Sequence, residues 1–324
     1  MPNENKNLIL LTGAGFTRNF GGFLAREMWS KIFNNPSVQA REKVRDVLSK
    51  DFDFESVYAE VLRGFRYDDD DKSALRTAVE QAYKELDDTV KNWSFNDRNP
   101  SGLNIYGLGD LIAIISHKGS DQGCFFTLNQ DLYMERARGF KSPGVLYSSM
   151  DPVASVRLPN ESEVEAVKST LNNASYIKLH GSYGWVSSLG GTQMVIGKNK
   201  SEDIEREPLL RWYLELFENA IYEGNKKLLV IGYGFRDDHI NNILLKGVQE
   251  HALSLYVVNT TDPESFKNLL EGRPSDNRIW EVSKYFPIWE KGIKGYFPYS
   301  LREIYPPDQS ETSMAQEIKR ALQN

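Results

Sequence analysis

The sequence predicts an α/β protein in which a Rossmann-like parallel sheet carries helices on both faces. Short apolar runs recur along the 324 residues, and each of them breaks into Gly, Asn or His. Long segments with apolar residues three and four positions apart separate these runs, so the strands that they form should be parallel. In such a sheet the functional residues are expected at the carboxyl ends of the strands.

Five apolar runs are the expected strands. The first, Leu8 to Leu11, is continuous and is bounded by polar residues and Gly13, which is typical of a strand buried on both faces. The other four runs carry apolar or β-branched residues. They are CFFTLN (124–129), YIKLHG (176–181), LLVIGYG (228–234) and SLYVVNT (254–260).

Each expected helix has one apolar face that can lie on the sheet. The helical patterns lie at 23–33, 73–93, 209–222 and 239–253. The region from about 36 to 122 holds helical runs but no comparable strand, so we interpret it as a helical insertion between the first two strands. Its acidic tract, Asp68 to Asp71, is expected to be a solvated loop.

The chain is expected to divide near residue 275. Residues 1–275 form the predicted domain, with the helical insertion at about 36–122. Residues 276–324 are an aromatic-rich extension, which should pack on the domain or lie at a subunit interface.

Composition argues against several classes of function. The 39 basic and 45 acidic side chains give a formal net charge of -6, which argues against a protein that mainly binds the nucleic-acid backbone. The single cysteine, Cys124, excludes an intramolecular disulfide and a four-cysteine zinc module. The first apolar run ends at Thr12, far short of the ~20 residues that span a bilayer, and no signal-peptide cleavage site follows it. We therefore expect a cytoplasmic protein that binds neither nucleic acid directly nor a membrane.

A Gly-Ala-Gly turn follows the first expected strand. Gly13 and Gly15 can adopt positive φ and let the backbone approach a ligand, and a helix that begins near Gly22 would point its N-terminal amides to the same place. These features predict a phosphate cradle, although a glycine pair after a strand also closes ordinary strand-to-helix turns. The pattern is neither GxGxxG nor GxxxxGK(S/T), so neither common nucleotide-binding fingerprint applies.

Polar residues follow other expected strands. Asn129 and Asp131 lie in TLNQD, and His180 lies in KLHGS. Taken singly, each has a structural interpretation, because Asn and Asp form turns or helix caps and a lone histidine is more often a structural residue. Histidine is also the best general base near neutral pH. Together with the glycine-rich segment 230–240 and Asn259, these strand ends favour a ligand site at one edge of the sheet.

Taken in this order, the segments GAGFTRNFG, TLNQD, LHGS, GYGFRDD and VVN resemble the motif series of the sirtuin (SIR2) superfamily, over residues 8–260. The forms KLHGS and IGYGFRDDHIN are more similar to the SIR2-like proteins of prokaryotic antiphage defence than to the protein deacylases. Deacylases carry two zinc-binding cysteine pairs and an I-P-D-F-R segment, which this chain lacks. The resemblance therefore implies a SIR2-like NAD-binding domain at 1–275 with no zinc module and no metal.

The resemblance implies that the protein cleaves NAD+ at the bond between nicotinamide and ribose. Asn129 and Asp131 would position the ribose and the attacking water, and His180 would act as the base on the water or on a ribose hydroxyl. The cofactor-binding residues implied are Gly13, Ala14, Gly15, Phe16 and Thr17 for the pyrophosphate, and Gly232, Gly234 and Asn259 for the adenosine half.

The implied activity is that of an NAD+ hydrolase that depletes the cofactor when antiphage defence is triggered. Two alternatives stay open: a non-catalytic module that senses NAD or ADP-ribose and gates a partner protein, and a zinc-free protein deacylase. The resemblance also implies homo-oligomerisation or a separate partner, such as a HerA-like ATPase or an Argonaute.

Overall fold

The protein is built around a six-stranded sheet with the strand order β10-β9-β8-β1-β2-β5, in which neighbouring strands are parallel. The computed structural model describes residues 7–91, 103–116, 124–147, 156–170, 176–188, 192–197, 200–272, 283–308 and 310–323. The strands are β1 (Leu8–Thr12), β2 (Cys124–Thr127), β5 (Tyr176–Lys178), β8 (Lys227–Ile231), β9 (Ser254–Val258) and β10 (Ile293–Phe297). The predicted α/β fold with a parallel sheet is confirmed.

The central strand β1 sets the register of the sheet and is buried along its whole length. Thr12 lies opposite Thr127 of β2 and Ile231 of β8. The segments that follow these three strands therefore leave the sheet at the same edge. We call this edge the carboxyl edge.

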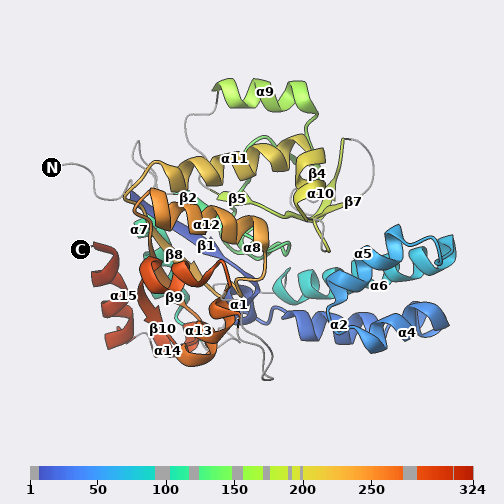
Figure 1. The fold of residues 1–324 in the computed structure, drawn as a ribbon, viewed down its shortest axis with the longest axis horizontal. Coiled ribbons are helices and arrows are strands. Elements are labelled where there is room, and N and C mark those ends of the chain that lie inside the picture. The colour runs from blue at the N-terminus through green and yellow to red at the C-terminus, as the bar shows by residue number, and fades with distance from the viewer. Residues whose placement is uncertain are drawn as a thin grey trace.

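Helices cover both faces of the sheet, as predicted. Ile9 and Leu11 of β1 belong to one hydrophobic core, and Leu8 and Leu10 belong to the other, because successive side chains of a strand point to opposite faces. The first face is covered by α11 (Pro208–Tyr222), α12 (Asp238–Glu250), α13 (Pro263–Glu271) and the π-helical turn η2 (Ile288–Gly292) (Figure 1). The second is covered by α1 (Ala14–Arg18), α7 (Ile105–Ser116), α8 (Tyr133–Arg138), α14 (Leu301–Ile304) and α15 (Ser313–Gln323).

A cluster of helices with a core of its own extends to one side of the sheet, at the right in Figure 1. We call it the helical lobe. It consists of α2 (Ala25–Phe33), α3 (Pro36–Gln39), α4 (Glu42–Lys50), α5 (Phe54–Arg63) and α6 (Asp69–Lys91). The expected helical insertion is thus present, but the lobe begins before residue 36, and α7 packs on the sheet instead of in the lobe.

The acidic tract at the start of α6 is not the solvated loop that we expected. The Asp71 side chain is only 2% exposed, and its Oδ1 lies 2.7 Å from Arg41 Nε. Asp68 also binds Arg41, with Oδ1 at 2.7 Å from Nη2. Acidic side chains are favourable in the first turn of a helix, and here Arg41 neutralises them.

Two features of the fold have no counterpart among the expected strands. The edge strand β10 comes from the aromatic-rich extension, where Gly295 and partly exposed side chains hide the apolar pattern of a strand. A second sheet has the order β3-β4-β6-β7. Its strands are β3 (Leu146–Tyr147), β4 (Val156–Arg157), β6 (Gly181–Val186) and β7 (Thr192–Met194), and α9 (Glu161–Thr170) and α10 (Lys200–Arg206) lie in the same part of the chain.

The chain passes from the main sheet into the second sheet at Gly181, which has a φ of +70° and begins β6 immediately after the β5 segment. In the parts of the chain that the structure describes, no helix has the length and apolar character needed to cross a membrane.

Candidate functional site

The turn after β1 packs directly against the turn after β8. The Gly15 amide donates a 2.9 Å hydrogen bond to the carbonyl of Gly232. A Cβ on Gly15 would lie 2.7 Å from Gly232 Cα, and a Cβ on Gly232 would lie 2.2 Å from the Phe16 nitrogen. The close approach of two backbones therefore explains why glycine occupies both turns.

The Gly-Ala-Gly turn differs from the expected one in two ways. Gly13 does not adopt positive φ, because its φ is -127°, whereas Gly232 in the facing turn has a φ of +66°. A short helix that we did not expect, α1, begins at Ala14 with Gly13 as its N-cap, and the helix expected near Gly22 follows as α2, from Ala25.

The turn offers fewer free amides than a phosphate cradle would need. The amides of Gly13, Gly15 and Phe16 donate to protein carbonyls at 2.9 to 3.0 Å. The Phe16 side chain is 1% exposed and packs in the core, so it does not face a ligand. Ala14 is exposed, and no described residue accepts a hydrogen bond from its amide.

Thr17 joins the first turn to the segment that follows β2. The Thr17 hydroxyl donates to Asp131 Oδ2 at 2.8 Å and accepts from Asn129 Nδ2 at 2.7 Å. Asn129 Nδ2 also donates to the carbonyl of Gly13 at 3.0 Å. Four of the residues singled out from the sequence therefore form one network, and no described residue donates a hydrogen bond to Asn129 Oδ1.

Asp131 is held by both of its carboxylate oxygens and by its backbone. Its Oδ1 accepts a 3.0 Å hydrogen bond from the Tyr133 amide. Its carbonyl accepts a hydrogen bond from Lys178 Nζ, and Lys178 forms a fully buried ion pair with Glu135, with 2.8 Å between Nζ and Oε1. These contacts fix the direction in which the Asp131 carboxylate points.

Gln130 connects this network to the turn that carries His180. Its side-chain amide donates to the carbonyls of His180, at 3.2 Å, and Val195, at 2.8 Å. Tyr83 of α6 donates its hydroxyl to Gln130 Oε1 at 2.6 Å, and both residues are buried. The sequence analysis did not single out Gln130, although it lies between Asn129 and Asp131 in the same motif.

His180 follows β5 at the carboxyl edge and is 3% exposed. Its Nε2 lies 2.9 Å from Nε2 of His239, which is in the first turn of α12. Burial lowers the pKa of His180 well below its ordinary value and lowers the pKa of His239 to about 4. Both imidazoles are therefore neutral near pH 7. His239 was missed as a site residue, although it lies in the VIGYGFRDDHI segment and is one of only four histidines.

Asp237 and Lys200 lie beside the two histidines. Lys200 Nζ is 2.7 Å from Asp237 Oδ1 and 2.7 Å from Glu55 Oε2 in the helical lobe. Burial alone would lower the pKa of Lys200, but the carboxylates of Glu55 and Asp237 raise it above its ordinary value. The result is a charged Lys200 held between two carboxylates.

The ligand atoms of His180, Asp237 and His239 all lie within 4.8 Å of one another. Two imidazoles and a carboxylate are a donor set that suits divalent transition metals. Here, however, the Lys200 ammonium group already occupies the carboxylate of Asp237. We therefore treat these side chains as a hydrogen-bonded and ion-paired cluster.

Two of the predicted adenosine-binding residues differ in their surroundings. Asn259 bridges the ends of β8 and β9, because its Nδ2 donates to the carbonyl of Tyr233 at 3.2 Å and its Oδ1 accepts from the Thr261 amide at 3.0 Å. A Cβ on Gly234 would meet nothing closer than Arg236 Cγ at 3.9 Å. Packing therefore does not explain the glycine at 234.

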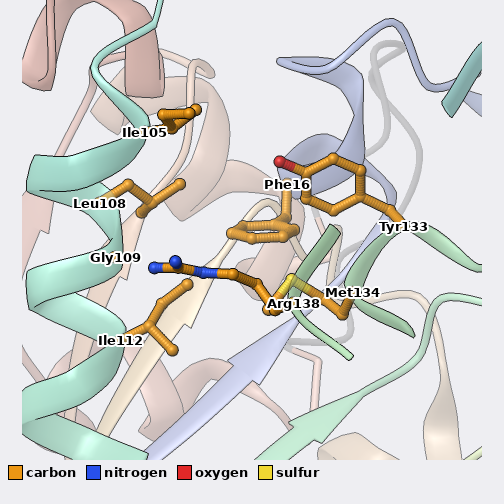
Figure 2. A pocket seen from close by; sticks show the side chains of 8 residues that line it. All are labelled: Phe16, Ile105, Leu108, Gly109, Ile112, Tyr133, Met134 and Arg138. Carbon is orange, nitrogen blue, oxygen red and sulfur yellow. The ribbon is translucent and has the colours of Figure 1, made fainter. Parts of the chain in front are cut away.

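A small cavity lies between α1, α7 and α8 (Figure 2). Its volume is about 10 Å³, which suits one water molecule and not a dinucleotide. Figure 2 shows Arg138 reaching toward Gly109 of α7, with Phe16 of α1 and Tyr133 of α8 on the opposite side from α7. This cavity belongs to the apolar layer beneath the sheet and is not the candidate site.

The predicted catalytic and NAD-binding residues thus lie in segments that follow the strands at the carboxyl edge, although the Phe16 side chain packs in the core. Contacts link the turns after β1, β2, β5, β8 and β9 to one another.

The sequence was also compared with models of known protein families. Residues 123–276 match the model of the SIR2-like domain family. The match covers nearly half of the chain, from just before β2 to just after α13, and it supports the resemblance to the SIR2 superfamily.

Two solved structures are similar to the whole chain. One is a crystal structure of a Sir2 homologue in complex with NAD, with 12% sequence identity and a TM-score of 0.45, covering 97% of this chain and 90% of that chain. The other is a mutant Sir2 homologue in complex with ADP-ribose, with 12% identity and a TM-score of 0.42, covering 98% of this chain and 96% of that chain. Among curated proteins, none matches this chain.

Proposed function

We propose that this protein is an NAD+ glycohydrolase that cleaves the bond between nicotinamide and ribose at the carboxyl edge of the sheet. The products would be nicotinamide, ADP-ribose and a proton. The observation that carries the proposal is the Asn129–Thr17–Asp131 network, most of which lies within the SIR2-like domain match.

The chemistry makes modest demands that this network can meet. Nicotinamide leaves as a neutral molecule, so the site has to stabilise an oxocarbenium-like transition state and place a water molecule. The Asp131 carboxylate, held by Thr17 and by the Tyr133 amide, supplies a fixed negative charge. Asn129 Oδ1 is available to accept a hydrogen bond from a ribose hydroxyl or from the water.

His180 is the base in this proposal. It is neutral near pH 7, because burial lowers its pKa, and a neutral imidazole can accept a proton. The backbone carbonyl of His180 accepts a hydrogen bond from the side chain of Gln130, the residue between Asn129 and Asp131, and this link between the two turns supports a shared site.

The binding assignments follow the same edge. Ala14, with its unused amide, would contact the pyrophosphate. The other residues that the sequence assigned to the pyrophosphate, Gly13, Gly15, Phe16 and Thr17, would shape the turn beside it, because their amides or side chains already bond within the protein. The adenosine half would lie along Gly232, Gly234 and Asn259. The open space at Gly234 supports this part of the proposal.

We place the activity in the cytoplasm, in antiphage defence, where activation would deplete cellular NAD+. The similarity of the KLHGS and IGYGFRDDHIN segments to SIR2-like defence proteins supports this role. Because an unregulated NAD+ hydrolase would harm its own cell, we also propose control by homo-oligomerisation or by a separate partner, such as a HerA-like ATPase or an Argonaute.

One observation favours a second candidate, a module that senses NAD or ADP-ribose without turning it over. The side chains of Thr17 and Asp131 are already satisfied by bonds within the protein. A site closed in this way is suited to binding that rearranges it and signals to a partner.

The test is release of nicotinamide and ADP-ribose from NAD+, followed by chromatography with purified protein and in extracts of cells that express it. Asn129→Ala and His180→Ala should each lower the rate at least about 100-fold. Two matched controls should keep the wild-type rate of NAD+ cleavage. They are Asn219→Ala, at an exposed position of α11, and His251→Ala, at the end of α12.

Calorimetry with NAD+ separates the two candidates. Turnover that both site variants abolish supports the hydrolase. NAD+ binding without nicotinamide release, both in the purified protein and in cell extracts, would instead favour the sensing module and exclude the hydrolase.

A further inference from the structure

His180 and His239 form a pair of imidazoles that come from different elements of the fold. His180 lies in the turn after β5, and His239 lies in the first turn of α12. Their Nε2 atoms are 2.9 Å apart, and their ring centroids are 5.0 Å apart at an interplanar angle of 44°. This is the geometry of one hydrogen bond between two ring nitrogens.

Such a bond requires that one ring donates and the other accepts. If His180 donates through Nε2, its Nδ1 carries a lone pair and can accept a proton from another molecule. His239 then accepts through Nε2 and carries its own proton on Nδ1. In the opposite arrangement His180 would have no free lone pair, so it could not act as a base.

The surroundings of the two rings differ, and the difference favours proton transfer from His180 to His239. His180 is almost fully enclosed, whereas His239 is partly exposed. The charged groups that face the pair are the carboxylates of Asp237 and Asp238, which favour a positive charge on His239, and the ammonium group of Lys200, which opposes it. A proton that leaves the enclosed ring therefore moves toward solvent.

We propose that His239 is a positioning residue that fixes the tautomer of His180 and takes over the proton that His180 removes from the attacking water. This inference rests on the proposed hydrolase activity. It assigns a role to a side chain that has no direct contact with the substrate.

The step balances in atoms and charge. As the water oxygen bonds to C1′ of the ribose, the electrons of the bond between C1′ and nitrogen leave with nicotinamide, which becomes neutral. One O–H bond of the water breaks, and a bond forms between that proton and Nδ1 of His180. The Nε2–H bond of His180 breaks as a new Nε2–H bond forms on His239, and His239 releases its Nδ1 proton to solvent. After the products leave, the Nε2 proton passes back to His180, His180 loses its Nδ1 proton to water in the emptied site, and His239 regains an Nδ1 proton from solvent. The resting tautomers are then restored, and one proton has been released for each NAD+ cleaved.

Transfer of the proton from His180 to His239, which we call the relay, avoids a stable positive charge on the buried His180 ring. A buried imidazolium is costly, because desolvation disfavours the charged form. Transfer to His239 leaves the buried ring neutral again and places the charge beside Asp237.

The first test compares His239→Gln with wild type. A glutamine amide can hold the orientation of His180 by a hydrogen bond but does not accept the proton. We expect kcat to fall about 10- to 100-fold while KM changes by less than about twofold, and the pH dependence of kcat/KM to change on its acidic side. His251→Gln is the matched control and should keep the wild-type profile.

The second test is chemical rescue. In His239→Ala, free imidazole should restore kcat at least about 10-fold, because it can accept the proton from His180. A residue with only a structural role would show no such rescue. Wild-type kcat and pH dependence in His239→Gln, or no rescue of His239→Ala, would overturn the relay.

The third test does not depend on activity, so it separates failure of the relay from failure of the proposed function. Nitrogen-15 NMR of the histidine rings in the full chain should show a proton on Nε2 of His180 and on Nδ1 of His239. The opposite tautomers would overturn the proposal, and so would a stoichiometric metal ion bound to both Nε2 atoms in the purified protein.

Discussion

Thr17 is the residue on which the proposed site depends most closely. It is 2% exposed, and its hydroxyl both donates to Asp131 and accepts from Asn129. The sequence placed Thr17 with the pyrophosphate, whereas the structure shows that its hydroxyl is used to orient the two proposed catalytic side chains. This contact between residues more than a hundred positions apart could not be predicted from local sequence.

Replacing Thr17 with Val should therefore separate orientation from packing. Valine keeps the shape of the side chain but removes the hydroxyl, so Asn129 and Asp131 lose a shared partner. We expect NAD+ turnover to fall at least about 10-fold, with a loss of about 1 to 3 kcal/mol in the free energy of unfolding. Thr17→Ser, which keeps the hydroxyl, should stay within a few-fold of wild type. Equal turnover in the Val and Ser variants would contradict the orienting role.

The glycines of the two turns provide a second prediction at this scale. Gly15→Ala would place a Cβ 2.7 Å from Gly232 Cα, so the two turns would have to separate. We expect it to lower the free energy of unfolding by about 1 to 3 kcal/mol in urea titrations. Gly234→Ala meets no atom closer than 3.9 Å and should unfold within about 0.5 kcal/mol of wild type.

The Gly234 variant also probes ligand approach. If Gly234→Ala keeps its stability but binds NAD+ more weakly, close approach of a ligand explains the glycine. Equal destabilisation by the two substitutions would contradict the packing explanation for Gly15.

At the scale of the elements, the buried strands were the most predictable part of the fold. The five apolar runs became β1, β2, β5, β8 and β9 because strands buried on both faces have continuous apolar sequences. β10 was missed because it is a partly exposed edge strand that contains Gly295. The strands of the second sheet were missed because they are two to six residues long and lack a clear alternating pattern.

The helical lobe contacts the site through side chains that no sequence pattern could place. Tyr83 of α6 reaches Gln130, and Asp87 of α6 forms a two-pronged ion pair with Arg136 of α8 at 2.5 and 2.6 Å. Glu55 of α5 holds Lys200. The lobe is therefore fastened to the segment after β2 and to the cluster beside His180.

Removing the Tyr83 hydroxyl should disturb the site through Gln130. Tyr83→Phe leaves the buried Gln130 Oε1 without its donor, which should cost about 1 to 3 kcal/mol of stability. We also expect a lower kcat, because Gln130 lies between Asn129 and Asp131. Tyr106→Phe, at an exposed position of α7, is the control for kinetics and thermal unfolding. An unchanged kcat in a destabilised Tyr83→Phe protein would show that the lobe supports the fold but not the site.

The whole molecule should lose stability in mild acid because of its buried histidines. Burial lowers the pKa of His239 from its ordinary value of 6.5 to about 4, and it also lowers the pKa of His180. The unfolded chain therefore binds protons below pH 6.5 that the folded protein resists. From His239 alone, the free energy of unfolding should fall by up to about 3 kcal/mol as the pH drops from 6.5 to 4.

Urea titrations at several pH values check this prediction. His239→Gln removes one of the two groups and should flatten the dependence in this range. A free energy of unfolding that does not fall between pH 6.5 and 4 would contradict the burial of neutral imidazoles at the site.

A crystal structure of the protein with ADP-ribose tests most directly whether the carboxyl edge is where NAD+ is cleaved. We expect the pyrophosphate at the N-terminal end of α1, beside Ala14, and the terminal ribose within hydrogen-bonding distance of Asn129 and His180. ADP-ribose bound elsewhere, or bound with its terminal ribose away from both side chains, would contradict the proposed site.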